Sequence, residues 1–132
     1  MEESSVRILV VDDYEPFRRF ERSTLERRCD LQVVCEAADG LEAVRQAEQL
    51  KPDLILLDIG LPKLNGIQAA QRIRELAPKA KIIFVTQESS PDVMRAALDI
   101  GALGYVLKVR AGTDLLAAVD SVLLGKRFVS TP

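Results

Sequence analysis

The sequence of 132 residues contains no histidine and only two cysteines. Without histidine the chain cannot form a Ser-His-Asp or Cys-His catalytic arrangement, ligate a metal through imidazole, or carry a phosphohistidine of its own. Cys29 and Cys35 form no CxxC pair, and we expect them to be reduced thiols in a cytosolic protein. These absences exclude a large share of enzyme chemistry.

Long hydrophobic runs and an excess of one charge are also missing. No apolar run approaches the ~18 residues that a membrane span needs, and the longest stretch is interrupted by Gly101, Gly104 and Lys108. Nothing near the N-terminus is typical of a signal peptide. A net charge of −2 provides no electrostatic reason to bind nucleic acid or an anionic membrane. We therefore expect a soluble chain that does not hold DNA by itself.

The remaining composition is typical of one packed domain. Apolar residues make up 48% of the chain and charged residues 29%, close to the values of ordinary soluble domains. The length also suits a single domain. Because Gly125 is a natural helix end, we predict one domain over residues 1–125, followed over 126–132 by a tail or the start of an interdomain linker.

Aliphatic segments alternate with amphipathic segments along the chain. Strands are predicted at Val6 to Val11, Leu31 to Ala37, Leu54 to Leu57, Lys81 to Val85 and Leu103 to Leu107. Helical spacing of apolar residues predicts helices at about 15–28, 41–50, 67–77, 91–100 and 115–124. This alternation predicts an α/β fold, a doubly wound five-stranded parallel sheet of the flavodoxin-like (βα)5 type with strand order 2-1-3-4-5.

Polar side chains follow four of the predicted strands, at the point where each strand ends. They are Asp12 and Asp13, then Asp58, then Thr86, and finally Lys108. Because the carboxyl ends of parallel strands meet at one edge of the sheet, we expect these side chains to converge there. Three converging carboxylates repel one another, and a hard divalent cation with oxygen ligands relieves that repulsion. The pattern therefore predicts a Mg²⁺ site suited to phosphate chemistry.

Asp58 is the best candidate for a phosphoacceptor, because it stands alone after the central strand while Asp12 and Asp13 form an adjacent pair. An aspartate carboxylate can attack phosphorus when positive charge neutralises the equatorial oxygens. Lys108 and the metal would supply that charge. Thr86 could donate a hydrogen bond to a phosphoryl oxygen, so its hydroxyl would report whether the group is present.

Taken together, these segments resemble the receiver domains of bacterial two-component response regulators over about residues 6–125. The resemblance rests on Ile8-Leu-Val-Val-Asp-Asp13, Asp58-Ile-Gly-Leu-Pro-Lys-Leu-Asn-Gly66, Thr86 and Gly104-Tyr-Val-Leu-Lys108, in family order and spacing. It implies a cytoplasmic phosphoacceptor that is not an enzyme, apart from slow loss of its own phosphate. The donor would be a phosphohistidine on a sensor histidine kinase.

The resemblance also implies which groups form the metal site and accept the phosphoryl group. Asp58 would be the phosphoacceptor and a metal ligand. Asp13 would ligate Mg²⁺ directly with Asp12 assisting, and the backbone carbonyl of Gly60 would complete the protein ligands.

Further roles follow from the resemblance around this centre. Thr86 and Lys108 would contact the phosphoryl group, and Tyr105 would move inward together with Thr86 as a switch. Simple packing in the final strand is the alternative interpretation of Tyr105. Tyr14 and Phe17 would contact the phosphotransfer helices of the kinase.

Several phrases look most like the NarL/LuxR-type regulators, whose members usually carry a helix-turn-helix DNA-binding domain after the receiver. They are Leu61 to Gly66, Gly101 to Lys108 and Gly125 to Ser130. No such domain is present here, so the chain is either a lone receiver or a piece of a longer protein, and we favour the second interpretation. Phosphorylation would then promote a homodimer or release a DNA-binding domain, and DNA would be bound only through that absent domain.

Two positions depart from the family pattern. Gln87 stands where a small residue usually follows the threonine, and its bulk could obstruct access to Asp58. Val109 replaces the proline that often follows the lysine with a cis peptide bond, and a non-proline cis bond costs ~2.5–4 kcal/mol. We therefore expect a trans bond after Lys108 and a loop of different shape.

Other functions compete with the phosphorylation switch. A receiver-like interaction module that works without phosphate is favoured only by Gln87 and the missing proline. A Mg²⁺-dependent phosphohydrolase would need a substrate pocket and a second carboxylate next to Asp58, and the sequence indicates neither. The arginines of the first predicted helix alternate with glutamates at paired spacing, such as Glu15 with Arg19, which predicts a solvated face rather than a nucleic-acid stripe.

Overall fold

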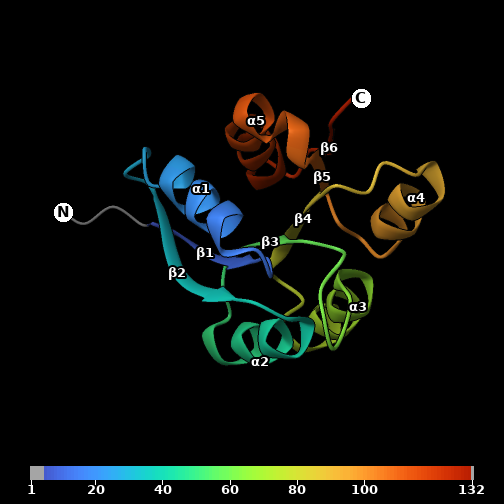
Figure 1. Ribbon diagram of the computed structural model, residues 1–132. Helices are drawn as coiled ribbons and strands as arrows, with labels where there is room; N and C mark the ends of the chain where they lie inside the picture. The colour runs from blue at the N-terminus through green and yellow to red at the C-terminus, as the bar shows by residue number, and fades with distance from the viewer. Residues whose placement is uncertain (1–4, 132) are drawn as a thin grey trace.

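The computed structural model describes residues 5–131, and helices alternate with strands along them (Figure 1). The elements are β1 (Val6–Val11), α1 (Glu15–Leu25), β2 (Leu31–Ala37), α2 (Gly40–Leu50), β3 (Leu54–Leu57), α3 (Gly66–Leu76), β4 (Lys81–Thr86), α4 (Pro91–Asp99), β5 (Gly104–Leu107), the 3-10 turn η1 (Lys108–Arg110), α5 (Ala111–Leu123) and β6 (Phe128–Val129). The five strands and five helices predicted from hydrophobic spacing are all present. The helix α1 ends at Leu25 rather than Arg28.

The strands form one parallel sheet in the order β2-β1-β3-β4-β5-β6. The prediction of a doubly wound parallel sheet is confirmed, but the prediction of five strands is wrong, because β6 adds a sixth beside β5. This strand comes from the segment that the sequence indicated as a tail or linker. Two residues are too short to show a hydrophobic period, and β6 forms because the outer edge of β5 offers unpaired backbone groups. Phe128 N donates to the Leu103 carbonyl at 2.9 Å, and Ser130 N donates to the Tyr105 carbonyl at 2.8 Å.

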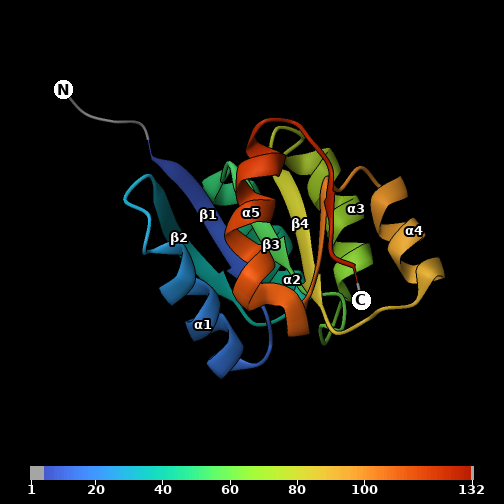
Figure 2. The ribbon, with the colours of Figure 1, turned by 90° about the horizontal axis from the view of Figure 1, so that it is seen from above.

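Helices cover both faces of the sheet, with α1 and α5 on one face and α2 and α3 on the other (Figure 1). Figure 2, viewed from above, shows α1 and α5 lying over the strands. Side chains of β1 alternate between the two cores: Ile8 and Val10 pack with α1 and α5, whereas Leu9 and Val11 pack with α2 and α3. Both faces of the central strands are buried, which explains their almost entirely aliphatic composition. In the described chain, no helix has the length and apolarity to cross a bilayer.

The outer surface of α1 carries paired charges. Arg19 contacts Glu15 at 3.2 Å, and Arg22 contacts Glu26 at 3.2 Å, both one helical turn apart. The prediction that acids partner the arginines of this helix is confirmed. Further pairs tie the helix to β2, since Arg18 Nε lies 2.9 Å from Glu36.

Ser130 fastens the end of β6 to the body of the domain. Its side chain is buried, and its hydroxyl donates to Asp114 Oδ2 of α5 at 2.7 Å while accepting from the Leu107 amide at 3.2 Å. A single hydroxyl thus links β6, β5 and the first turn of α5.

Replacing Ser130 with alanine removes both of these side-chain hydrogen bonds and leaves the Leu107 amide without its partner. Because an unsatisfied buried donor is costly, we expect the free energy of unfolding to fall by about 1–3 kcal/mol. Urea denaturation of the wild-type chain and of Ser130→Ala measures this difference. Thr131→Ala, at the exposed neighbouring position, is the matched control, and an equal loss there would contradict the assignment.

Candidate functional site

The polar residues predicted to converge do lie together at the carboxyl edge of the sheet. Loops after β1, β3, β4 and β5 enclose a hollow of about 390 Å³. Its lining includes Asp13, Asp58, Gly60, Thr86, Gln87 and Lys108. Asp12 lies beside these residues and is almost fully buried.

Three carboxylates form the acidic part of this site. One carboxylate oxygen from each of Asp12, Asp13 and Asp58 lies within 4.8 Å of the others. Asp12 and Asp58 are buried while Asp13 is exposed to the hollow. Burial raises the pKa of Asp12 above its ordinary value of 3.8, because the loss of hydration outweighs the stabilising contact with Lys108.

Lys108 is the cation that faces these acids. Its Nζ lies 2.8 Å from Asp12 Oδ2 and 3.1 Å from Asp58 Oδ2, and it donates a hydrogen bond to Asp58. Burial alone would lower the pKa of Lys108, but pairing with Asp12 and Asp58 raises it above 10.5. Within residues 5–131, Asp12 Oδ2 has this ionic contact but accepts no hydrogen bond, so a buried oxygen is left with free acceptor capacity.

Local backbone geometry places the two buried aspartates. The Tyr14 amide donates to Asp12 Oδ1 at 2.9 Å, and the Ile59 amide donates to Asp58 Oδ1 at 2.7 Å. The start of α3 packs directly on the backbone that follows β3, because a Cβ at Gly66 would lie 2.0 Å from the Asp58 carbonyl oxygen. Only glycine permits this approach, which holds the loop that carries Gly60 against the end of the strand.

Thr86 and Tyr105 are connected through the loop after β4. The Thr86 hydroxyl accepts from the Glu88 amide at 3.2 Å, and the Tyr105 hydroxyl donates to the Glu88 carbonyl at 2.6 Å. Tyr105 is fully buried, so the structure shows the inward arrangement, and the movement itself stays a prediction. Burial, reinforced by the nearby charge of Glu88, raises the pKa of Tyr105 to about 12.

The two departures from the family pattern lie at the rim of the site. Gln87 is exposed and lines the hollow. Val109 is 90% exposed, and it belongs to the short 3-10 turn η1 that precedes α5. Every peptide bond of the described residues is trans, as we expected for the bond after Lys108.

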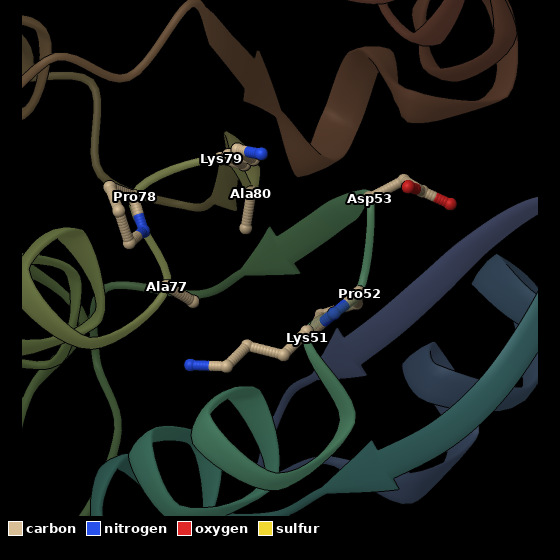
Figure 3. Close-up of a pocket in the computed structure, with 7 residues that line it drawn as sticks. All are labelled: Lys51, Pro52, Asp53, Ala77, Pro78, Lys79 and Ala80. Atoms are coloured by element: carbon tan, nitrogen blue, oxygen red, sulfur yellow. The ribbon is translucent and has the colours of Figure 1, made fainter.

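A second hollow, of about 370 Å³, lies at the opposite edge of the sheet (Figure 3). It is lined by the segments that lead into β3 and β4, including Lys51 and Lys79. Lys51 Nζ donates to the Leu76 carbonyl at 2.6 Å, so its charge neutralises the C-terminal end of α3. None of the predicted site residues lines this hollow.

Sequence reasoning missed Glu21, a buried acid on the inner face of α1. Its side chain is 1% exposed, and its Oε1 has no hydrogen-bond partner within the described chain. Burial raises the pKa of Glu21 well above 4.5, and the negative charge of Asp12 adds to this effect. The signal was available, because Glu21 lies midway between Phe17 and Leu25, at the four-residue spacing of a core stripe.

A parallel α/β sheet with an acidic trio, a threonine and a lysine at its carboxyl edge defines the class of protein. A family model described as the response regulator receiver domain matches residues 8–120, and the chain belongs to this family. Its relatives place it among the receiver domains of LuxR-type response regulators.

Three relatives illustrate the match. The chain is 34% identical over 122 residues to the response regulator protein VraR of Staphylococcus aureus. This alignment covers 92% of this chain and 58% of VraR. A LuxR-family two-component response regulator from Aurantimonas has a TM-score of 0.90 and 36% identity over 98% of this chain and 91% of that one. The receiver domain of the putative response regulator NarL from Mycobacterium tuberculosis matches with a TM-score of 0.88 and 30% identity. The match covers 94% of this chain and 100% of that domain. The chain thus spans little more than half the length of VraR.

Glu21→Gln removes the titratable group and nearly keeps its shape. Because the folded pKa is raised, the stability that protonated Glu21 contributes is fully present below pH 4.5 and is lost as the pH rises through the folded pKa. We expect the free energy of unfolding of the variant to increase relative to that of the wild type as the pH rises. Near neutral pH the variant should be more stable by about 1–3 kcal/mol.

Urea denaturation of both proteins at several pH values from 4.5 to neutral measures this difference in the free energy of unfolding. Glu15→Gln, on the exposed side of the same helix, is the control and should change the free energy of unfolding far less than Glu21→Gln does. A difference for Glu21→Gln that does not vary with pH would contradict the role of the buried acid.

Proposed function

We propose that Asp58 is the phosphoacceptor of this receiver domain and that its Mg²⁺-dependent phosphorylation by a sensor histidine kinase switches an output surface. The observation that carries the proposal is the contact of Lys108 with both Asp12 and Asp58 beside an open hollow. The proposed domain comprises residues 1–125, and residues 126–132, of which Phe128 and Val129 pair with β5 as β6, would begin the interdomain linker. The proposed location is the cytoplasm.

The acidic trio fits a magnesium ion. Its oxygens lie within 4.8 Å of one another, the buried Asp12 Oδ2 has spare acceptor capacity, and carboxylate and carbonyl oxygens are the ligands that Mg²⁺ prefers. Asp13, Asp12, Asp58 and the backbone carbonyl of Gly60 would hold the ion. When bound, it would supply positive charge to phosphoryl oxygens.

Asp58, Lys108 and Thr86 have different roles in the proposed phosphoryl transfer. A carboxylate oxygen of Asp58 attacks phosphorus, so a phosphorus–oxygen bond forms while the phosphorus–nitrogen bond of the donor phosphohistidine breaks and its electron pair leaves with the imidazole. The ammonium of Lys108 and the hydroxyl of Thr86 contact the phosphoryl oxygens. A water molecule that attacks the same phosphorus would break its bond to the Asp58 oxygen and release inorganic phosphate, so the group would be lost slowly without turnover of an external substrate.

The switch would travel through the loop after β4. If the Thr86 hydroxyl turns to the phosphoryl group, it releases the Glu88 amide, and the loop that Tyr105 anchors changes position. The affected surface comprises α4, β5 and α5, with β6 covering the edge of β5. Dimerisation of this chain is proposed as the output, and solved structures of the related RcsB describe RcsB dimers bound to DNA. DNA would be reached through a further domain only.

Asp58 should gain one phosphoryl group when the chain is incubated with Mg²⁺ and a small-molecule phosphodonor. Intact-protein mass measures the gain, which we expect to vanish in Asp58→Asn and on chelation of Mg²⁺. Asp53→Asn, an exposed carboxylate at the other edge of the sheet, should behave as the wild type. A gain retained in Asp58→Asn would contradict the assignment.

The absence of a gain separates the alternatives. If Mg²⁺ still binds, a strict need for the kinase or obstruction by Gln87 explains the result. If Mg²⁺ does not bind, the phosphate-independent interaction module becomes the better interpretation.

Gln87→Ala should exchange phosphate with small phosphodonors faster than the wild type. The exposed amide stands at the mouth of the hollow, and its removal clears the approach to Asp58, so we expect both phosphorylation and hydrolysis to accelerate by about two- to tenfold. Time courses of intact-protein mass measure the two rates. Ser89→Ala, two residues further along the same exposed loop, is the control; unchanged rates in Gln87→Ala would show that access is not limited there.

A further inference from the structure

The aromatic ring of Phe17 lies under the ammonium group of Lys108. Lys108 Nζ is 4.6 Å from the ring centroid, within the distance at which the negative face of an aromatic ring attracts a cation. Phe17 belongs to the first turn of α1, whereas Lys108 follows β5. The contact therefore joins two elements far apart in the sequence at the site itself.

We propose that Phe17 is a positioning residue for phosphoryl transfer, because its ring holds the Lys108 ammonium at the place where Asp58 accepts phosphate. This inference rests on the proposed function and adds to it a residue that does not touch the phosphoryl group. The ring acts through Lys108 alone.

The Phe17 ring is suited to this role because it carries no net charge. Lys108 already faces Asp12 and Asp58, and a third carboxylate beneath it would add to the repulsion of the acidic trio. An aliphatic side chain would remove water from the ammonium without attracting its charge. The ring attracts the cation without competing with the phosphoryl oxygens, so it keeps holding Lys108 while the lysine exchanges a carboxylate for phosphate.

The ring is held firmly in turn. The Phe17 amide donates to the Tyr14 carbonyl at 3.0 Å, and its ring packs against Phe20 with centroids 5.4 Å apart. The same helical turn is tied to the site, because Arg18 Nη1 donates to the Asp12 carbonyl at 2.7 Å. Ring, lysine and aspartate thus form one connected arrangement.

Fluorinated phenylalanines inserted at position 17 alone test the electrostatic part of the contact. Mono-, di- and trifluorophenylalanine weaken the negative face of the ring in steps while nearly keeping its size. We expect the rate constant for Mg²⁺-dependent phosphorylation of Asp58 by acetyl phosphate to fall in the same steps, by roughly three- to thirtyfold across the series. Phe17→Tyr keeps the ring and should stay within about twofold of the wild type.

Phe128 supplies the control, since it belongs to β6 and is a partly buried aromatic residue outside this arrangement. The same analogues at position 128 should leave the rate constant unchanged. If Asp58 is phosphorylated and the rate constant does not change across the fluorinated series at position 17, the positioning role is overturned and the proposed function stands.

A second measurement keeps the inference testable if the wild-type chain is not phosphorylated at all, the result that counts against the proposed function. The fluorinated series should lower the urea midpoint of the wild-type chain stepwise, and this dependence should disappear in a Lys108→Met background. The same dependence in both backgrounds would mean that Phe17 only packs, and it would overturn the proposal.

Discussion

The paired contact of Lys108 with Asp12 and Asp58 is the interaction on which the rest of the site depends. Parallel strands bring their carboxyl ends to one edge, so acids placed there crowd one another at the mouth of an apolar sheet. Removing charges from water is costly unless each finds a partner. Lys108 follows β5 and reaches across the end of β4 to the ends of β1 and β3. The strand order therefore determines which cation can balance which acids.

Much of the fold follows from patterns that the sequence displays openly. Aliphatic strands buried on both faces and amphipathic helices differ in period, so each element could be recognised, and the parallel topology followed from their alternation. The strand β6 could not be recognised in this way, because Phe128 and Val129 are too few to establish a period. Their pairing depends on the free edge of β5, which exists only after the sheet has formed.

The candidate site shows a similar division. The convergence of Asp58, Thr86 and Lys108 could be predicted, since it depends only on where strands end. The inward position of Tyr105 and its bond to the Glu88 carbonyl depend on side-chain and loop conformation, which spacing does not reveal. Glu21 was missed because a carboxylate in an amphipathic helix is ordinarily assigned to the solvent face, whereas its burial comes from the packing of α1 on the sheet.

The direction of β6 determines where the described chain ends relative to the polar site. The helix α5 carries the chain back toward the amino ends of the strands, away from Asp58. Because β6 runs parallel to β5, it returns the polypeptide to the carboxyl edge and leaves the buried Ser130 one hydrogen bond from the Leu107 amide, next in sequence to Lys108. The end of the described chain and the polar site thus share one edge of the sheet. A small displacement of Lys108 needs to cross only one peptide unit and one hydrogen bond to reach Ser130.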